Sequence, residues 1–217
     1  MRWLQEQKGW ISPGQFSPAL EKGGYISQLD RYMIEKVTGC LNQRRTEEKR
    51  FVPVSVNLSW MDFYDENMLE WIVRGLKKNN QNEQKIRFEI TETSLAAIGE
   101  NHTRMLTHLK ENGAEILLDD FGSGYSSFGM LQDYDFDILK MDISFVRNIG
   151  VNKKSESILR AIIDMAHQLE IRLVAEGAET EEQVAFLREN GCDYIQGYYY
   201  YKPMPEKEFL QLLDEGK

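Results

Sequence analysis

Short apolar runs alternate with longer amphipathic segments along this chain, and that alternation limits the possible folds more than any other feature. The runs are rich in β-branched and apolar residues and are bounded by turn residues, as buried strands are. The segments between them carry apolar residues at helical spacing. Strands separated by helices indicate βαβ units, so the sequence predicts an α/β protein with a parallel sheet. The predicted strands are 51–58, 85–91, 115–119, 138–142, 172–175 and 194–195.

Capping residues indicate where two of the helices begin. Ser12, Pro13 and Gln15 stand in the order of an N-cap, a first helical residue and a capping-box partner. Thr180 and Gln183 repeat the box later in the chain. We therefore expect helices over about 13–21 and 180–190. Further helices are predicted over about 27–43, 67–78, 100–112, 155–170 and 205–214, with a short one near 127 and a solvated linker at 44–50.

Polar residues occur at or near the carboxyl ends of all the predicted strands. An open doubly wound sheet and a closed barrel are both compatible with the alternation, but no glycine-rich phosphate fingerprint follows the first strand. In a barrel, the carboxyl ends of the strands converge on one mouth, where active sites lie. The sequence therefore favours a TIM-like (β/α) barrel. The converging residues are Asn57, Glu89, Asp119, Lys140, Glu176 and Gln196.

The adjacent carboxylates Asp119 and Asp120 are the most informative members of this set. Two neighbouring carboxylates repel each other and need a cation or a proton, unless one caps the turn and the other is solvated. An all-oxygen ligand set without histidine suits Mg²⁺ or Mn²⁺. Two such ions can activate a water for in-line displacement at phosphorus, with Lys140 orienting it or offsetting charge. The residues thus suggest metal-assisted phosphate-ester hydrolysis; solvated strand ends or a lyase-type chemistry are the alternatives.

Composition narrows the class of protein. The 217 residues suit a single domain over 1–217, and the net charge of −9 argues against a nucleic-acid polymer as partner. No apolar run is long enough for a membrane segment, and no signal peptide is visible. The two cysteines, Cys40 and Cys192, have no disulfide or metal spacing, which predicts a reducing, cytoplasmic location.

Seven segments of the chain together closely resemble the EAL domain, the bacterial phosphodiesterase of cyclic di-GMP. They occur in order and at matching spacing over essentially the whole chain. They are Ser-Val-Asn-Leu-Ser at 55–59, Phe-Glu-Ile-Thr-Glu at 88–92, Asp-Asp-Phe-Gly-Ser-Gly-Tyr-Ser-Ser at 119–127, Leu-Lys-Met-Asp at 139–142, Ala-Glu-Gly-Ala-Glu at 175–179, Gln-Gly-Tyr at 196–198 and Lys-Pro-Met-Pro at 202–205.

The resemblance implies a modified (β/α)₈ barrel that hydrolyses cyclic di-GMP to linear pGpG with two Mg²⁺ or Mn²⁺ ions. By resemblance, Lys140 would lie beside the attacking water, and Gln196 would position that water and the metal shell. Glu92 would steady the 119–127 loop, and Arg2 would contact a substrate phosphate. Glu176 would serve both catalysis and metal binding. The expected metal ligands are Asn57, Glu89, Asp119, Asp120 and Glu176.

One departure from the family concerns the amino terminus. The family's Glu-Ala-Leu triplet, whose glutamate is a metal ligand, would lie just before Met1, so the resemblance implies an EAL domain lacking its first two strands. Strands 51–58 and 194–195 would then lack a neighbour on one side, and hydrolysis by this chain would be impaired. A catalytically inactive cyclic di-GMP receptor or protein-interaction regulator is the alternative. The resemblance also implies upstream sensor or GGDEF domains and a homodimer as candidate partners.

Overall fold

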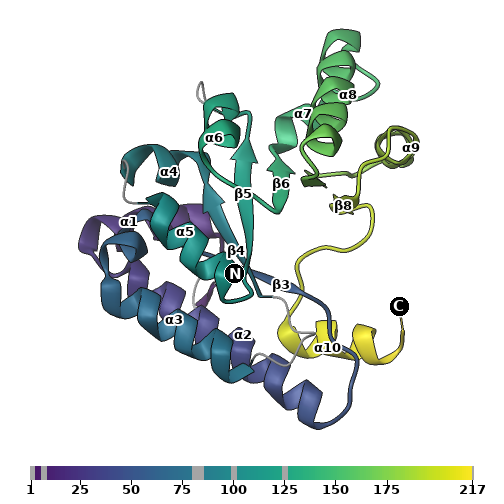
Figure 1. The fold of residues 1–217 in the computed structure, drawn as a ribbon. Helices are drawn as coiled ribbons and strands as arrows, with labels where there is room; N and C mark the ends of the chain where they lie inside the picture. Colours follow the sequence, from purple (N-terminus) through teal and green to yellow (C-terminus); the bar gives the residue numbers. More distant parts are fainter. Residues whose placement is uncertain (1–2, 6–8, 80–85, 99–101, 124–126, 217) are drawn as a thin grey trace.

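A parallel sheet of six strands is the centre of the molecule (Figure 1). The structure is a computed structural model that describes residues 3–5, 9–79, 86–98, 102–123 and 127–216. The strands follow one another across the sheet in chain order, which confirms the predicted parallel α/β architecture. Among the described residues, β3 and β8 form the two open edges, so the sheet is a half-barrel. The strands are β3 (Val54–Asn57), β4 (Ile86–Thr91), β5 (Glu115–Phe121), β6 (Ile138–Met141), β7 (Arg172–Glu176) and β8 (Tyr194–Gln196).

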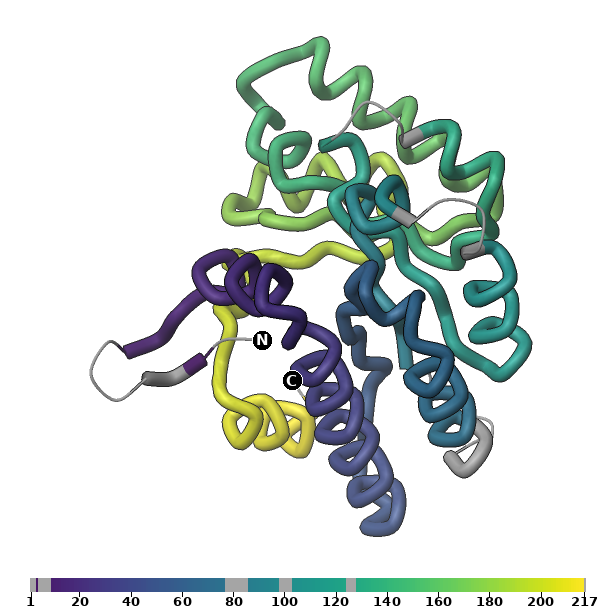
Figure 2. Tube along the Cα trace, turned by 90° about the vertical axis from the view of Figure 1, so that its left-hand side faces the viewer, coloured from purple at the N-terminus to yellow at the C-terminus, as the bar shows by residue number. Residues whose placement is uncertain are grey.

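Helices connect the strands, and α2, α5 and α8 pack against β3, β5 and β7. A hairpin of β1 (Trp3–Gln5) and β2 (Gly9–Ile11) precedes them and projects from the body of the molecule (Figure 2). The hairpin, η1, α4 and α7 were not predicted, because segments this short carry too little periodicity. The helices are α1 (Pro13–Gly23), α2 (Ile26–Thr46), η1 (Trp60–Tyr64, 3₁₀), α3 (Glu66–Asn79), α4 (Glu92–Ile98), α5 (His102–Glu111), α6 (Ser127–Asp133), α7 (Ile143–Arg147), α8 (Lys153–Gln168), α9 (Glu181–Glu189) and α10 (Glu206–Asp214).

Both predicted capping boxes are confirmed. The Ser12 amide donates to Gln15 Oε1 at 3.3 Å, and Pro13 is the first residue of α1. At α9, the Thr180 amide donates to Gln183 Oε1 at 3.0 Å, and the Gln183 amide donates back to Thr180 Oγ1 at 3.3 Å. Each box satisfies backbone N–H groups that the first turn of a helix leaves without a carbonyl partner.

The predicted solvated linker at 44–50 is wrong at its start, because α2 continues to Thr46. Arg44 is only 5% exposed, and its Nε donates to the carbonyl oxygen of Arg50 at 2.7 Å. Its guanidinium also pairs with Asp214 of α10, which lies beside α2 in Figure 2. A partner 170 residues away in sequence therefore holds the last turn of α2 against α10.

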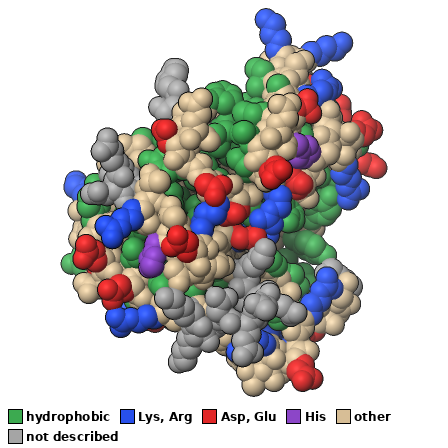
Figure 3. Space-filling view, in the orientation of Figure 1, with side chains coloured by type: hydrophobic (Ala, Val, Ile, Leu, Met, Phe, Trp, Pro, Cys, Tyr) green, Lys and Arg blue, Asp and Glu red, His purple; other side chains and the backbone are tan. Residues whose placement is uncertain are grey.

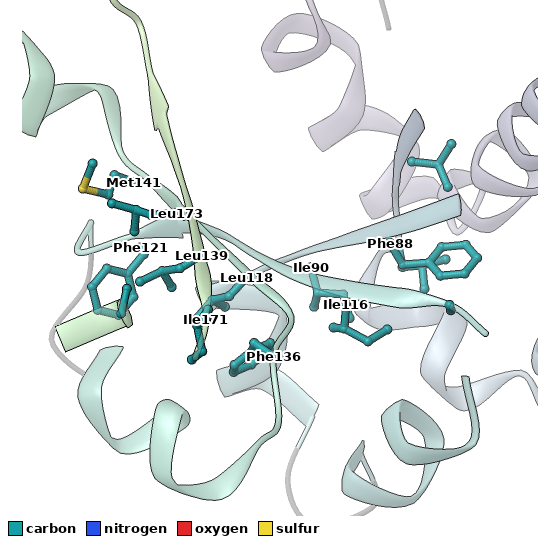
Figure 4. Close-up of a cluster of buried hydrophobic side chains, with 14 of the residues drawn as sticks. Phe88, Ile90, Ile116, Leu118, Phe121, Phe136, Leu139, Met141, Ile171 and Leu173 are labelled. Carbon is teal, nitrogen blue, oxygen red and sulfur yellow. The ribbon is translucent and has the colours of Figure 1, made fainter. Parts of the chain in front are cut away.

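The pleat of the strands divides their side chains between two faces. On the face beneath the helices, apolar side chains from β4 to β7 form one continuous layer (Figure 4). On the opposite face, Leu117, Ile138 and Val174 form a second, smaller apolar cluster. Residues two positions further along share this second face, so the pleat places the strand-end polar groups directly beyond that cluster.

An ionic layer lies at the other end of the same face. Glu115 accepts hydrogen bonds from Arg87 Nε at 2.9 Å and from an Arg172 guanidinium nitrogen at 2.8 Å. The Arg87 guanidinium also lies over the Tyr194 ring, 5.3 Å from its centroid. These contacts link β4, β5, β7 and β8 at their amino ends. Figure 3 shows acidic and basic side chains interspersed over the middle of one face of the molecule.

Across the described ranges, which omit 1–2, 6–8, 80–85, 99–101, 124–126 and 217, no helix combines the length and apolarity needed to span a membrane.

Candidate functional site

Strand register brings the predicted site residues to one edge of the sheet. Asn57 of β3 is aligned with Glu89 of β4, and Glu176 of β7 is aligned with Gln196 of β8. Asp119 is aligned with Thr91, the last residue of β4. Since all the strands are parallel, the carboxyl ends of β3 to β8 form a single rim, as predicted.

Lys140 of β6 occupies the centre of this rim and is only 8% exposed. Its Nζ lies 3.1 Å from Asp119 Oδ1, 3.3 Å from Glu176 Oε2 and 3.7 Å from Glu89 Oε2. One ammonium group thus joins carboxylates from three other strands. The structure brings together four of the predicted site residues in direct ion pairs.

The electrostatics of the cluster follow from burial and from an excess of negative charge. Burial alone would lower the pKa of Lys140, but Glu89, Asp119 and Glu176 together hold that pKa above its ordinary value. Burial raises the pKa of Glu89, with Asp119 and Glu176 adding to the rise, while Lys140 and a hydrogen bond with Ser55 oppose it. Lys140 therefore keeps its proton, and its single positive charge neutralises only part of the negative charge of the three carboxylates.

Asp120 lies on the same strand as Asp119 but in a different conformation. The predicted strand ended at Asp119, whereas β5 continues to Phe121 through a register shift. Asp120 has a φ of 57°, and its amide donates to Asp119 Oδ1 at 2.9 Å. Aspartate tolerates this left-handed conformation better than most residues. Burial, followed by the charge of Asp119, raises the pKa of Asp120.

The other predicted residues stand around this cluster. Asn57 and Gln196 are exposed at the ends of β3 and β8. Glu92, predicted to steady the 119–127 loop, is 4% exposed and is the first residue of α4. Arg2 and residues 124–126 of that loop lie outside the described residues.

The donor set fits a hard divalent cation in its chemistry. The oxygen atoms come from four carboxylates and one amide, and their only close counter-charge in the described site is the Lys140 ammonium. No three His, Cys, Asp or Glu side chains in the described part of the chain already form a metal-binding group. Since hard divalent cations prefer oxygen ligands, the chemistry of these residues fits a Mg²⁺-like or Mn²⁺-like ion.

A cleft of about 600 Å³ opens beside Glu176 and Gln196. Its wall includes Arg147 of α7 and the segment that follows β8, with Tyr198, Tyr201 and Lys202. Lys202 Nζ also lies 5.6 Å from the centroid of the Tyr198 ring. Arg147 could not be recognised from the sequence, because α7 is too short to show a helical period. Asp142 is the residue that could have indicated this helix, because aspartate is a common N-cap. In the structure its Oδ1 accepts from the Ser144 amide at 2.9 Å at the start of α7.

Comparisons with known proteins agree with this geometry. Cyclic di-GMP phosphodiesterase NbdA of Pseudomonas aeruginosa is 32% identical over 214 residues, which cover 97% of this chain and 27% of NbdA. Probable cyclic di-GMP phosphodiesterase PdeG of Escherichia coli is 32% identical over 212 residues, 98% of this chain and 42% of PdeG. The chain thus spans less than half the length of these curated relatives.

A solved structure and a family model extend the comparison. The PaMucR phosphodiesterase in its c-di-GMP complex matches with a TM-score of 0.87 and 30% identity, over 96% of this chain and 84% of that one. The model of the EAL domain matches residues 1–203. Sequence, fold and site together therefore show that the chain belongs to the EAL domain family.

Proposed function

We propose that this chain is a phosphodiesterase domain that opens one phosphodiester bond of cyclic di-GMP to give linear pGpG. The observation that carries the proposal is Lys140, buried among three carboxylates at the rim of the sheet. The proteins it resembles support the substrate, since PdeG and NbdA are named for cyclic di-GMP and the PaMucR structure contains it. In this reaction a water oxygen bonds to phosphorus, one P–O ester bond breaks, and the leaving oxygen takes up a proton.

Each rim residue has a proposed part in this reaction. Asn57, Glu89, Asp119, Asp120 and Glu176 would hold two Mg²⁺ or Mn²⁺ ions. Bound ions of this kind lower the pKa of water and stabilise negative charge on phosphoryl oxygens.

Lys140 keeps its proton at neutral pH, because its pKa is raised, so it acts as a hydrogen-bond donor rather than a base. Its Nζ would orient the water or the phosphoryl oxygens. Gln196 would position the water from β8, Glu92 would steady the loop after Asp119, and Arg2 would contact a substrate phosphate.

We also propose that the domain works within a larger protein, since its curated relatives are more than twice as long as the chain. Upstream sensor or GGDEF domains, or a second copy of the domain, are the partners that would regulate it. A cytoplasmic location agrees with Cys40 and Cys192, which are both free thiols.

The direct experiment is incubation of the chain with cyclic di-GMP and Mn²⁺ at excess protein, with chromatography to separate pGpG from the substrate. Formation of pGpG at a rate proportional to protein concentration would support the proposal. Binding of cyclic di-GMP without pGpG would favour the alternative, a receptor or regulator on the same fold.

Metal binding gives a separate prediction. Millimolar Mn²⁺ should raise the melting temperature, because a ligand that binds only the native state stabilises it. Asp119→Asn removes one ligand charge at the centre of the rim and should abolish the rise. Asp164→Asn, an acid-to-amide change on helix α8, is the matched control and should leave the rise intact. An equal Mn²⁺ response in the Asp119→Asn variant would contradict the proposed metal site.

A further inference from the structure

A buried polar cluster lies behind the β3 end of the rim. It consists of Asp30 on α2, Asp62 on η1 and Ser59, the N-cap of η1. The three residues are 7%, 0% and 8% exposed, respectively. Aspartates this deeply buried are uncommon unless they are paired or protonated, so the cluster requires an explanation.

Ser59 connects the two acids. Its amide donates to Asp62 Oδ2 at 2.8 Å and to Asp30 Oδ2 at 3.2 Å, and its hydroxyl donates to Asp62 Oδ2 at 3.1 Å. The backbone just after β3 is thus held from two directions, by a helix far away in sequence and by the helix that follows it.

The geometry requires a proton within the cluster. Asp30 Oδ2 and Asp62 Oδ2 accept from the same Ser59 amide, so the two buried carboxyl groups lie close together, and ionised carboxylates can only accept hydrogen bonds. In addition, Asp62 Oδ1 is buried and has no donor among the described residues. A protonated Asp30 supplies the missing donor.

The surroundings place that proton on Asp30. Burial, followed by the charge of Asp62, raises the pKa of Asp30 from 3.8 to about 8, and the Ser59 hydrogen bonds oppose the rise. Helices α2, α3 and α4 pack against η1. On α2, Arg31 pairs with Glu35, and on α3, Arg74 pairs with Glu70. Each of these charged side chains therefore has its ion-pair partner on its own helix.

Glu92, at the start of α4, is a further acidic residue on a helix that packs against η1. It is buried, and the largest causes of the raised pKa of Asp30 are burial and Asp62, opposed by Ser59.

The cluster is linked to the candidate site through the backbone. Ser59 follows Asn57 by two residues, and the intervening Leu58 amide donates to the carbonyl oxygen of Glu89 at 2.9 Å. Ser59 is thus connected through Leu58 to both Asn57 and Glu89, which are the proposed metal ligands on β3 and β4.

We propose that Asp30 is a positioning residue: in its neutral form it shares its proton with Asp62, and together they clamp Ser59 so that Asn57 is held at the rim. Its role in metal binding rests on the proposed function, but the shared proton does not. The carboxamide of asparagine imitates a protonated carboxyl group, since it both donates and accepts. Asp30→Asn should therefore preserve the clamp, whereas Asp30→Ala should break it.

The first test is the pH dependence of melting in the wild type and Asp30→Asn, with no metal or substrate. The pKa of Asp30 is 3.8 in the unfolded chain and about 8 in the folded protein, so folding takes up a proton between these two pH values. The stability that this proton contributes falls as the pH rises through that window. The melting temperature of Asp30→Asn relative to wild type should therefore increase by about 10 °C from pH 5 to pH 8.

Glu35→Gln, an exposed acid-to-amide change on the same helix, is the control and should show no such trend. If the difference in melting temperature between Asp30→Asn and wild type stays constant across this pH range, the proposal of a shared proton is wrong.

The second test separates clamping from general stability. Asp30→Ala should weaken Mn²⁺ binding about tenfold, as loss of a group that orients a ligand does, and Asp30→Asn should stay within about twofold of wild type. The backbone amide resonance of Asn57 should shift in Asp30→Ala and not in Asp30→Asn. Equal effects of the two variants would overturn the clamp. If Mn²⁺ does not bind at all, the proposed function fails, while the pH trend and the Asn57 resonance still decide this inference.

Discussion

Replacing Lys140 with alanine should lower the rate of cyclic di-GMP hydrolysis by on the order of a hundredfold or more, as loss of a charge-stabilising catalytic donor does. Binding of cyclic di-GMP should fall much less, because the ammonium group faces carboxylates rather than the cleft. Rates from single-turnover assays and affinities from calorimetry would separate the two effects.

A fall in stability must be distinguished from a loss of chemistry in this variant. Without Lys140, the carboxylates Glu89, Asp119 and Glu176 repel one another, so the melting temperature should also fall. Since the pKa of Lys140 is raised by these carboxylates, its stabilising contribution is present below the ordinary value of 10.5 as long as the carboxylates stay ionised, which includes a neutral assay. Saturating Mn²⁺ should restore part of the lost stability but not the lost rate.

Lys110→Ala is a matched control for Lys140→Ala. Lys110 Nζ also pairs with two aspartates, Asp135 at 2.6 Å and Asp137 at 3.3 Å, but these precede β6 at the opposite end of the sheet. Its removal should leave turnover within about twofold of wild type, as expected of a surface ion pair. A Lys140→Ala variant that turns over as fast as this control would remove Lys140 from the mechanism.

The second large effect is expected from Gly197→Ala, one residue beyond Gln196. A Cβ atom at this position would lie 2.1 Å from the carbonyl oxygen and 2.4 Å from the amide nitrogen of Ala178. Both atoms belong to the backbone, so no side-chain rotation relieves the contact. The Gly177 and Ala178 amides donate to the carbonyl oxygen of Gln196 at 2.8 and 3.1 Å. The added methyl group would push the backbone at Gly197 away from Ala178 and weaken these two hydrogen bonds.

We expect Gly197→Ala to lose about 3 kcal/mol of unfolding free energy, from overpacking and the weakened hydrogen bonds, and about 10 °C in melting temperature. Hydrolysis should fall with it, since Gln196 would separate from Glu176. Gly39→Ala is the control: Gly39 lies within α2 with open space around it, so alanine should stabilise the helix by about 1 kcal/mol. A Gly197→Ala variant that melts within about 2 °C of wild type would contradict the predicted clash.

Much of the site could be located from the sequence, because its residues belong to strands with strong local signals. Asp119 follows an apolar run, and Lys140 and Glu176 stand in or at the end of others, so the parallel sheet alone places them on one rim. The capping boxes at Ser12 and Thr180 could also be predicted from the sequence, since each depends on residues three positions apart.

Other features depend on partners that are remote in sequence, and no local pattern predicts them. Arg44 in the last turn of α2 pairs with Asp214 of α10, and Asp120 lies within the register shift between β5 and β6. Short elements such as α7 were missed for a different reason, because a single turn or two carries no readable period.

The sequence by itself determined the parallel α/β architecture, the order of strands and helices, and which polar residues end the strands, because each of these depends on neighbours along the chain. Only the tertiary structure decided that Lys140 pairs with three carboxylates and that Asp30 meets Asp62 behind β3. Those contacts join side chains from separate elements, and burial then sets their pKa values. Strand register and desolvation exist only once the chain is packed.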